Sequence, residues 1–589
     1  MSEGTTPLPA TRRISVIAQD PSIRRADGRV LMASIDVPAE ELLPGPIGYR
    51  VQVVDYDAST GRYAGAHEIP ASAEAEPAAW AEGRPDIVGD RRFHAQNAYA
   101  LVMKTLARFE FALGRRVGWS FKVHQLKVAP NGLMDANAFY SRQDEGLVFG
   151  YFPGRDGKTV YTCLSHDIVV HETTHALLDA LRERYLLPSG PDQAAFHEGY
   201  ADVIALLSVF SQVELVAELL RRGAGSDGDF IAERHVAADA LRKSALFGLA
   251  EQMGDEMHAV RGDALRRSAE IQPGPAWLEE AEFLEPHRRG EILVAAVMNG
   301  FIEAWTARLQ AAKAPEQKSH ALRRVAEEGA DLAAALATLW IRALDYMPPV
   351  HATFGDALSA AITADIEVRP DDSRYELRRH MLASFKAYGI APASTRPDAP
   401  GAWRHEPAPM RYERVRFESM RTDKDEVFRF LWENRKALEL REGAYTEVFS
   451  VRPCLRIGLD GFTLHETVAE YYQVARLTPT ELAQKKIKLP REYVQTLSRK
   501  PLLEDEDENP GPVTPVYGGG VLIFDEWGKL KYHVHNDVFG SRQSARLQYL
   551  WDIGHLRPGS ETARFSPEGL AAIHRARAIG VRRFPAEGW

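Results

Sequence analysis

The chain has 589 residues, which is more than one ordinary hydrophobic core holds, so two or three domains are expected. With 45% hydrophobic and 26% charged residues, its composition is that of a globular protein and not of a disordered or fibrous one. The formal net charge of -10 argues against a general electrostatic attraction to nucleic acid or to an anionic membrane surface. We therefore expect neither nucleic acid nor a membrane among its partners.

Cysteine usage and the N-terminal sequence favour a cytoplasmic protein. The two cysteines, Cys163 and Cys454, lie far apart in the chain and imply no disulfide framework. The first residues have neither the basic start nor the apolar core of a secretory signal. The apolar stretch at 206–220 is interrupted by Glu214 and Glu218, so we expect no segment long enough to span a membrane.

The spacing of apolar residues predicts an α+β protein that begins with strands. Residues 12–56 contain alternating or β-branched runs separated by Pro, Gly and Asp, the pattern of strands and turns, which makes 1–90 a strand-rich region. Residues 92–113 have a helical spacing, and strands are predicted again at 121–150. The region 163–388 is predicted to be mostly helical. The helical face of 92–113 consists of Ala98, Val102, Leu106 and Phe109, and the long amphipathic segments lie at 194–211, 291–312 and 319–345.

The last third of the chain is predicted to be a separate α+β module. Residues 389–410 are rich in Pro, Ala and small polar residues and indicate a linker. The module, 411–589, combines predicted strands at 446–475, a helix at 479–499 and a strand pair joined by a turn at 525–529. An acidic run at 504–508 is typical of a solvated face. Nothing in the module indicates its role, although a protein partner is conceivable.

The segment His171-Glu172-Thr173-Thr174-His175 predicts a metal site on a helix. The four-residue spacing puts both imidazoles on one face, together with Ile168 and Leu178. Zinc takes neutral imidazole and carboxylate ligands, and Glu172 would lie beside a zinc-bound water as its general base. A chain of this composition shows the pattern by chance roughly one time in twenty. The chance reading must still give two buried imidazoles polar partners, which a metal would supply.

The third ligand is expected 23 residues after the second histidine, at Glu198. Asp202 follows one helical turn later on the same face and can accept the second ring N–H of a ligating histidine. A solvated acidic face is the alternative interpretation of this pair. His197 is the competing ligand and ranks second.

These residues resemble the thermolysin family of gluzincins, in which H-E-x-x-H is followed by a ligand Glu and then by an Asp four residues later. The stretch 135–140 is similar to the family's edge-strand N-A-F-W segment, which implies that Asn137 and Ala138 hold a substrate backbone. The run into the helix, 166–171, also matches, and Asp179 matches the Asp just after H-E-x-x-H, which implies a supporting position beside the metal ligands. The resemblance covers about 90–388 and implies a two-lobed peptidase domain at 91–388, with a strand-rich N-terminal lobe and an α-helical C-terminal lobe.

Three further positions take roles from this resemblance. Tyr185 matches the family's oxyanion-side tyrosine, with a loop that differs in length by one residue. Arg266, in Gly262-Asp263-Ala264-Leu265-Arg266, matches the arginine that binds a substrate carbonyl, and a surface arginine is the alternative. His287 matches the histidine that stabilises the tetrahedral oxyanion, with Glu282 or Glu285 to orient it. A helix-capping histidine is the alternative for His287.

The chain departs from the family at two places. Val209 stands where calcium-binding members carry a Glu, so we expect no structural calcium, and Asp167 loses its expected role. His197 replaces the usual Asn before the third ligand, which changes how His175 is held.

The resemblance and the residues together predict a zinc peptidase with one zinc ion per chain, acting on a peptide or protein, and an endopeptidase rather than an exopeptidase. One alternative is a catalytically silent, zinc-bearing interaction protein on the same scaffold. Another is a zinc hydrolase that acts on a small amide. The edge-strand segment at Asn137 and Ala138 favours an extended peptide.

Two patterns in the C-terminal module have plainer interpretations. His533, His535 and Asp537 alternate along one predicted strand and would share a face, so a second metal site is conceivable, but such a row is more often a solvated strand face. The aromatic residues that could form a ligand platform are interpreted as core. They are Tyr471, Tyr472, Tyr549 and Trp551.

Overall fold

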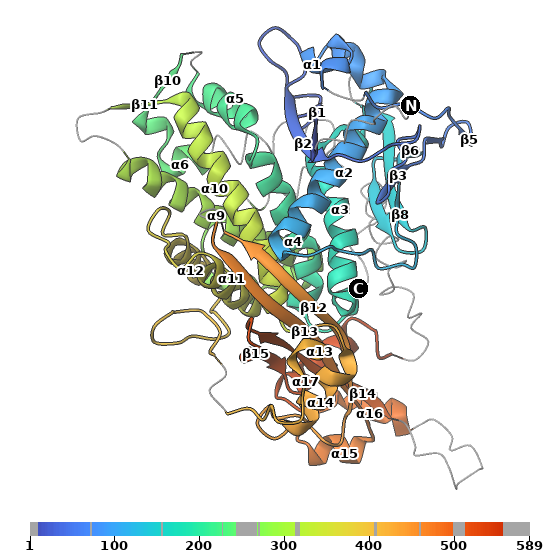
Figure 1. Cartoon of the computed structure of the whole chain (residues 1–589), viewed down its shortest axis with the longest axis vertical. Coiled ribbons are helices and arrows are strands. Elements are labelled where there is room, and N and C mark those ends of the chain that lie inside the picture. The colour runs from blue at the N-terminus through green and yellow to red at the C-terminus, as the bar shows by residue number, and fades with distance from the viewer. Residues whose placement is uncertain are drawn as a thin grey trace, which may run out of the picture.

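The computed structural model describes residues 10–70, 73–154, 157–225, 228–242, 268, 271–312, 318–405, 409–458, 461–498 and 513–557 (Figure 1). It is a mixed α+β structure with several separate sheets, which confirms the predicted class.

The N-terminal part is built from short strands around one long helix. β1 (Thr11–Ile17) and β2 (Met32–Pro38) form an antiparallel pair. A second sheet contains β3 (Val51–Val53), β6 (Leu126–Leu133), β8 (Gly146–Pro153) and β7 (Ala138–Ser141) in this order, and β9 (Thr159–Tyr161) also pairs with β8. In this sheet β3, β6 and β8 run parallel, whereas β7 is antiparallel to β8 and forms the sheet edge. The smaller elements are β4 (Tyr56–Asp57), β5 (Arg62–Tyr63) and α1 (Ala78–Glu82).

The helix α2 (Arg91–Leu113) confirms the helix predicted over 92–113. The Asp90 side chain caps its first turn by accepting from the Arg92 N–H, and Gly114 ends it with a φ of 67°. All four residues of the predicted buried face are buried.

The helices that hold the predicted metal ligands lie at the centre of the molecule (Figure 1). α3 (His166–Leu181) and α4 (Pro191–Phe210) pack on each other, and α4 packs on α9 (Pro286–Ala311). The helices around them are α5 (Val213–Ala224), α6 (Ala238–Leu241), α10 (Leu322–Ala343), α11 (Phe354–Val368) and α12 (Leu377–Ala387). A short pair, β10 (Phe230–Ala232) and β11 (Ser319–Ala321), lies beside them. The three long amphipathic segments predicted in this region are confirmed as α4, α9 and α10.

The C-terminal part is an antiparallel sheet with helices. The strands β12 (Tyr445–Ile457), β13 (Thr463–Leu477), β14 (Thr514–Phe524) and β15 (Leu530–Asn536) lie in this order. The predicted turn at 525–529 joins β14 to β15. The helices are α13 (Phe417–Met420), α14 (Lys424–Glu433), α15 (Pro479–Gln484), α16 (Arg491–Ser498) and α17 (Arg542–Asp552).

The C-terminal sheet is not separate from the helical part, which differs from the sequence expectation. Val468, Val521 and Tyr532 belong to the same hydrophobic core as α2, α10 and α11. Buried ion pairs also cross the junction, between Arg182 and Glu470 at 2.5 Å and between Arg456 and Asp345 at 2.5 Å. Buried charges of this kind need a paired partner, so the two parts hold each other in place.

The segment predicted as a linker lies on the helical part over its described residues 389–405. The Ala393 N–H donates to the Gly355 carbonyl at 3.1 Å, and the Trp403 indole N–H donates to the Tyr346 carbonyl at 2.8 Å. These bonds tie the segment to the start of α11 and to the short turn that follows α10. Its composition indicated a linker, but its backbone and its tryptophan are bonded to the helical part.

One described helix, α9, is long and apolar enough to cross a membrane, although 72% of its apolar window is buried inside the protein. The helices α4 and α5 pass the same test together, but they are bent by 83° at their junction. No such segment was expected from the sequence, in which charged residues interrupt the apolar stretch at 206–220. The interruptions at Glu214 and Glu218 lie in α5, outside α9.

Candidate metal centre

Three predicted ligands meet where α3 and α4 pack together. His171 and His175 lie one turn apart on α3, and Glu198 lies on α4. The two Nε2 atoms are 2.7 Å apart, and the Glu198 Oε2 atom is 3.8 Å from that of His171 and 3.6 Å from that of His175. All three residues are buried. Within the described part of the chain, this is the one group of three His, Cys, Asp or Glu residues that could hold a metal ion.

The three distances define the space between the donor atoms. A triangle with sides of 2.7, 3.8 and 3.6 Å has a circumscribed radius of about 2.0 Å, so one point lies about 2.0 Å from all three atoms. Metal–nitrogen and metal–oxygen bonds of transition metals have about this length. The donor atoms therefore converge on a position that a metal ion fits.

Asp202 holds the first histidine. Its Oδ1 atom lies 2.7 Å from the His171 Nδ1 atom, which donates the ring N–H to the carboxylate. With the proton on Nδ1, the Nε2 atom keeps its lone pair and faces the other ligands. Asp202 thus has the contact that the sequence predicted for it.

His197 is not part of the ligand group. Its ring stacks on the His175 ring, with centroids 4.7 Å apart and an interplanar angle of 18°. His197 therefore packs beside the ligand His175, which favours Glu198 over His197 as the third ligand.

Glu172 lies between α3 and the sheet edge. Its side chain is 1% exposed, and its Oε2 atom accepts the backbone N–H of Tyr140 on β7 at 2.9 Å. Because alternate residues of a strand direct their backbone groups to the same side, Ala138 points the same way as Tyr140, away from β8. The Ala138 N–H donates to the Asn137 Oδ1 atom at 2.9 Å. The outer edge of β7 thus faces the side on which Glu172 lies.

Tyr140 was not assigned a role from the sequence, yet it joins β7 to α3 twice. Besides its backbone bond to Glu172, its hydroxyl donates to the Asp179 Oδ2 atom at 2.8 Å. Arg142 also donates to Asp179, and this bond raises the pKa of the arginine. Asp179, predicted beside the metal site, therefore fixes the strand and not a histidine. The position of Tyr140, two residues after Ala138 on the predicted edge strand, is the sequence signal that could have pointed to this contact.

His287 reaches the ligand group from α9. Pro286 is the first helical residue of α9, and Glu285 caps the helix through the Arg288 N–H. The same Glu285 carboxylate lies 2.9 Å from His287 Nδ1, and His287 Nε2 lies 3.5 Å from Glu198 Oε2. Of the two orienting residues proposed from the sequence, Glu285 has this role, whereas Glu282 pairs with Arg288 at 2.8 Å.

Tyr185 does not join the group. Tyr185 is 1% exposed, and its hydroxyl donates to the Pro348 carbonyl at 2.6 Å. Its ring packs edge-on against Phe196, and burial raises its pKa. Because the Tyr185 hydroxyl donates its only proton to Pro348, it cannot also donate to an oxyanion. The loop before Tyr185 differs from the family's by one residue, and this difference accompanies the different position of the tyrosine. Arg266 lies outside the described residues. Val209, at the position of the family's calcium ligand, is buried in the core of α4.

The histidine row in β15 has partners of another kind. The rings of His533 and His535 stack with centroids 4.2 Å apart, and the Tyr471 hydroxyl lies 2.7 Å from His533 Nε2. Asp537 pairs with Arg441. Tyr471 and Tyr472 are buried in the core, as predicted, whereas Tyr549 and Trp551 are half-buried.

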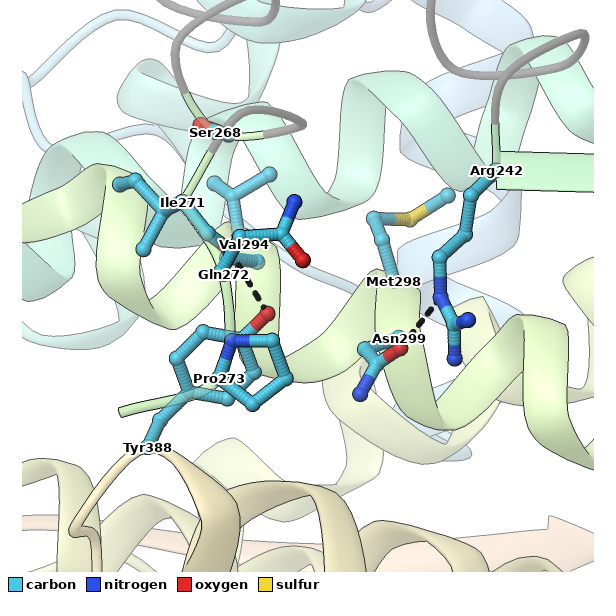
Figure 2. A pocket seen from close by; sticks show the side chains of 10 residues that line it. Arg242, Ser268, Ile271, Gln272, Pro273, Val294, Met298, Asn299 and Tyr388 are labelled. Carbon is cyan, nitrogen blue, oxygen red and sulfur yellow. Dashed lines mark hydrogen bonds between the residues drawn. The ribbon is translucent and has the colours of Figure 1, made fainter. Parts of the chain in front are cut away.

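A cavity of about 180 Å³ lies on α9 but away from the ligand group (Figure 2). Val294, Met298 and Asn299 line it from the helix, and Tyr388 and Arg242 stand at its sides. The Arg242 Nε–H donates to the Asn299 Oδ1 atom at 2.9 Å. Ser268, also in its wall, stands between residues that are not described. The described wall mixes apolar and polar side chains and brings no cluster of titratable groups together.

No protein-family model matches the chain, and no curated protein matches it.

Proposed function

We propose that the chain is a zinc-dependent peptidase whose domain has a thermolysin-like, two-lobed arrangement. The observation that carries the proposal is the buried group of His171, His175 and Glu198, with Glu172 next to the first ligand and turned toward an edge strand. Binding alone would explain the three ligands. It would not explain a fourth, buried carboxylate between the ligands and a strand edge.

The ligand group suits zinc. Zinc binds imidazole nitrogen and carboxylate oxygen at about 2.0–2.2 Å, close to the radius that the three donor atoms define, and catalytic zinc sites use three protein ligands. When bound, the ion supplies Lewis acidity that lowers the pKa of water and polarises a carbonyl group. Asp202 keeps His171 in the tautomer that can bind zinc.

Glu172 would be the general base. Its carboxylate accepts the proton of the attacking water, and the Tyr140 amide orients one of its oxygens. Since this amide belongs to the strand beside the substrate, the base and the substrate are positioned by the same element. The proton can then pass from Glu172 to the leaving amine.

His287 would stabilise the oxyanion. In the protonated ring the Nδ1–H donates to the Glu285 carboxylate, and the Nε2–H, which faces the ligand group 3.5 Å from Glu198, can donate to the oxyanion. A donor placed where charge develops contributes about 10² to 10³ in rate. Tyr185 has no part in the proposed mechanism.

The substrate would be an extended peptide. β7 is a sheet edge, and an edge strand can pair with a peptide backbone. The Asn137 Nδ2 group is buried and makes no hydrogen bond within the described part of the chain, so it can donate to a substrate carbonyl. A small amide would leave most of this edge unused.

The test is cleavage of a peptide library with both termini blocked by the purified, zinc-quantified protein. Glu172→Gln keeps the three ligands, so it should bind one zinc per chain and cleave nothing. Glu183→Gln removes an equal charge from an exposed position just beyond α3 and should cleave like the wild type.

Internal cleavage by the wild type and by Glu183→Gln alone would support an endopeptidase. One bound zinc with no cleavage by any of the three proteins would contradict the peptidase proposal.

A further inference from the structure

Two arginines without carboxylate partners meet where the C-terminal module contacts the helical part. Arg184 follows α3, and Arg546 lies on α17. Their guanidinium groups lie over the same ring, that of Tyr517, at 5.1 and 5.2 Å from its centroid. Arg184 also lies over Tyr472, at 4.6 Å. The two aromatic rings offer cation–π contacts but no negative charge.

Arg546 is the more unusual of the two. It is 9% exposed, and neither its Nε nor its Nη1 atom has a hydrogen-bond partner among the described residues. Burial lowers its pKa to about 10. A buried guanidinium normally has its hydrogen bonds satisfied, because an unpaired buried charge is costly.

Three other arginines near this junction each form an ion pair with a carboxylate. Arg182 pairs with Glu470, Arg542 with Asp356 and Arg289 with Asp192, each at 2.9 Å or less. Glu470 also accepts the Tyr472 hydroxyl at 2.5 Å. Across the described part of the chain, no carboxylate pairs with Arg184 or Arg546.

A hydrogen bond joins the Arg184 backbone to α4, the helix that carries Glu198. The Gln193 side chain donates to the Arg184 carbonyl at 3.1 Å, and Gln193 precedes Glu198 by five residues of α4, roughly 7.5 Å of helix.

We propose that Arg184 and Arg546, on either side of the junction, bind a carboxylate of the peptide substrate. The proposal rests on the proposed function for the identity of the ligand, because acidic side chains and the C-terminus are the anions of an ordinary peptide. Arginine binds carboxylates through paired N–H donors, and the Tyr517 ring keeps both guanidinium groups in position. The C-terminal module would then supply part of the substrate site.

The first experiment measures binding of small probes to the full chain by ligand-observed NMR. N-acetylglutamic acid α-amide carries a side-chain carboxylate, N-acetylglutamine carries a free α-carboxylate, and N-acetylglutamine amide carries neither. One or both anionic probes should bind, and the neutral probe should not. Which anionic probe binds distinguishes an acidic side chain from a chain terminus.

Arg184→Gln and Arg546→Gln should each weaken binding of the anionic probe at least tenfold. Arg557→Gln is the matched control, because Arg557 lies over the Trp551 ring in the same module but is exposed. Arg546→Lys keeps the charge at the buried position and, with thermal unfolding, separates loss of binding from loss of folding. Equal binding of charged and neutral probes, or unchanged binding by both Gln variants, would overturn the proposal.

The second experiment compares cleavage of paired blocked peptides that differ by Glu or Gln at one position. The wild type should prefer the Glu peptide, and the Arg184→Gln variant should lose this preference while it still cleaves the Gln peptide. If no protein cleaves any peptide but the anionic probe binds through the two arginines, the peptidase proposal fails and the anion site stands. If peptides are cleaved with no effect of the arginines, the anion site fails alone.

Discussion

Gly199 of α4 and Gly290 of α9 lie in direct backbone contact, because a Cβ atom on Gly199 would stand 2.7 Å from the Gly290 carbonyl oxygen. Glu198 directly precedes the first glycine, and His287 lies three residues before the second. The absence of side chains at this crossing lets the two helices approach closely enough to bring His287 to Glu198.

Gly290→Ala should therefore separate the helices at the site. The added methyl group would meet the Gly199 amide nitrogen at 3.0 Å, so overpacking should lower the free energy of unfolding by about 1–3 kcal/mol. Peptide turnover should fall further than stability alone explains, because His287 moves away. Gly300→Ala on the same helix is the control, since its methyl group would meet the flexible end of Met381. Equal turnover in both variants would show that the crossing does not position His287.

Asp202→Asn should weaken zinc binding without unfolding the protein. The amide cannot accept the His171 Nδ1–H as a charged group, and loss of such a partner typically costs about 10–100-fold in metal affinity. The measurement is competition with a fluorescent chelator, with Glu214→Gln on the exposed face of α5 as control. Wild-type affinity in Asp202→Asn would mean that another group holds His171.

Local spacing was enough to predict which residues form the candidate metal group. His171 and His175 are separated by one helical turn, and so are Glu198 and Asp202, and a helix brings residues at this spacing to one face. The same periodicity predicted α2, α4, α9 and α10. Each of these predictions needs only the geometry of one element, which the sequence carries.

The contacts that the sequence did not reveal depend on packing between distant elements. The Glu172–Tyr140 bond requires a strand to lie against α3, and the Arg182–Glu470 pair joins residues 288 positions apart. The composition of 389–410 could not show that Trp403 would anchor that segment. No periodicity within one element encodes such contacts, so the junction with the C-terminal module appeared only in the structure.

Tyr185→Phe separates the family resemblance from the observed contact. If the hydroxyl only donates to the Pro348 carbonyl, its removal should lower the free energy of unfolding by about 1–3 kcal/mol and leave turnover unchanged. A residue that stabilises the oxyanion would instead lose about 10² to 10³ in turnover. His287→Ala, measured beside it, should show the second behaviour. A large loss of turnover in Tyr185→Phe would require its loop to rearrange when substrate binds.

His351 should make the protein less stable as the pH falls. Burial, with Arg546 nearby, lowers the pKa of His351 to about 3, from 6.5 for an exposed histidine. Below pH 6.5 the unfolded chain binds a proton that the folded protein does not, so the stabilisation is complete above pH 6.5 and declines down to about pH 3. The expected slope is up to about 1.4 kcal/mol per pH unit.

Urea unfolding at pH 7.5, 6.5 and 5.5 can measure this slope. His351→Asn removes the titrating ring and suits the φ of 56° at this position, so its stability should depend less on pH than that of the wild type. His124→Asn, at an exposed position, should keep the wild-type slope. Parallel pH profiles for the wild type and His351→Asn would mean that this imidazole takes up its proton equally in both states. In that case the protonated His351 ring would lie beside Arg546 in the folded protein and would still donate to the Tyr517 carbonyl, at 2.7 Å.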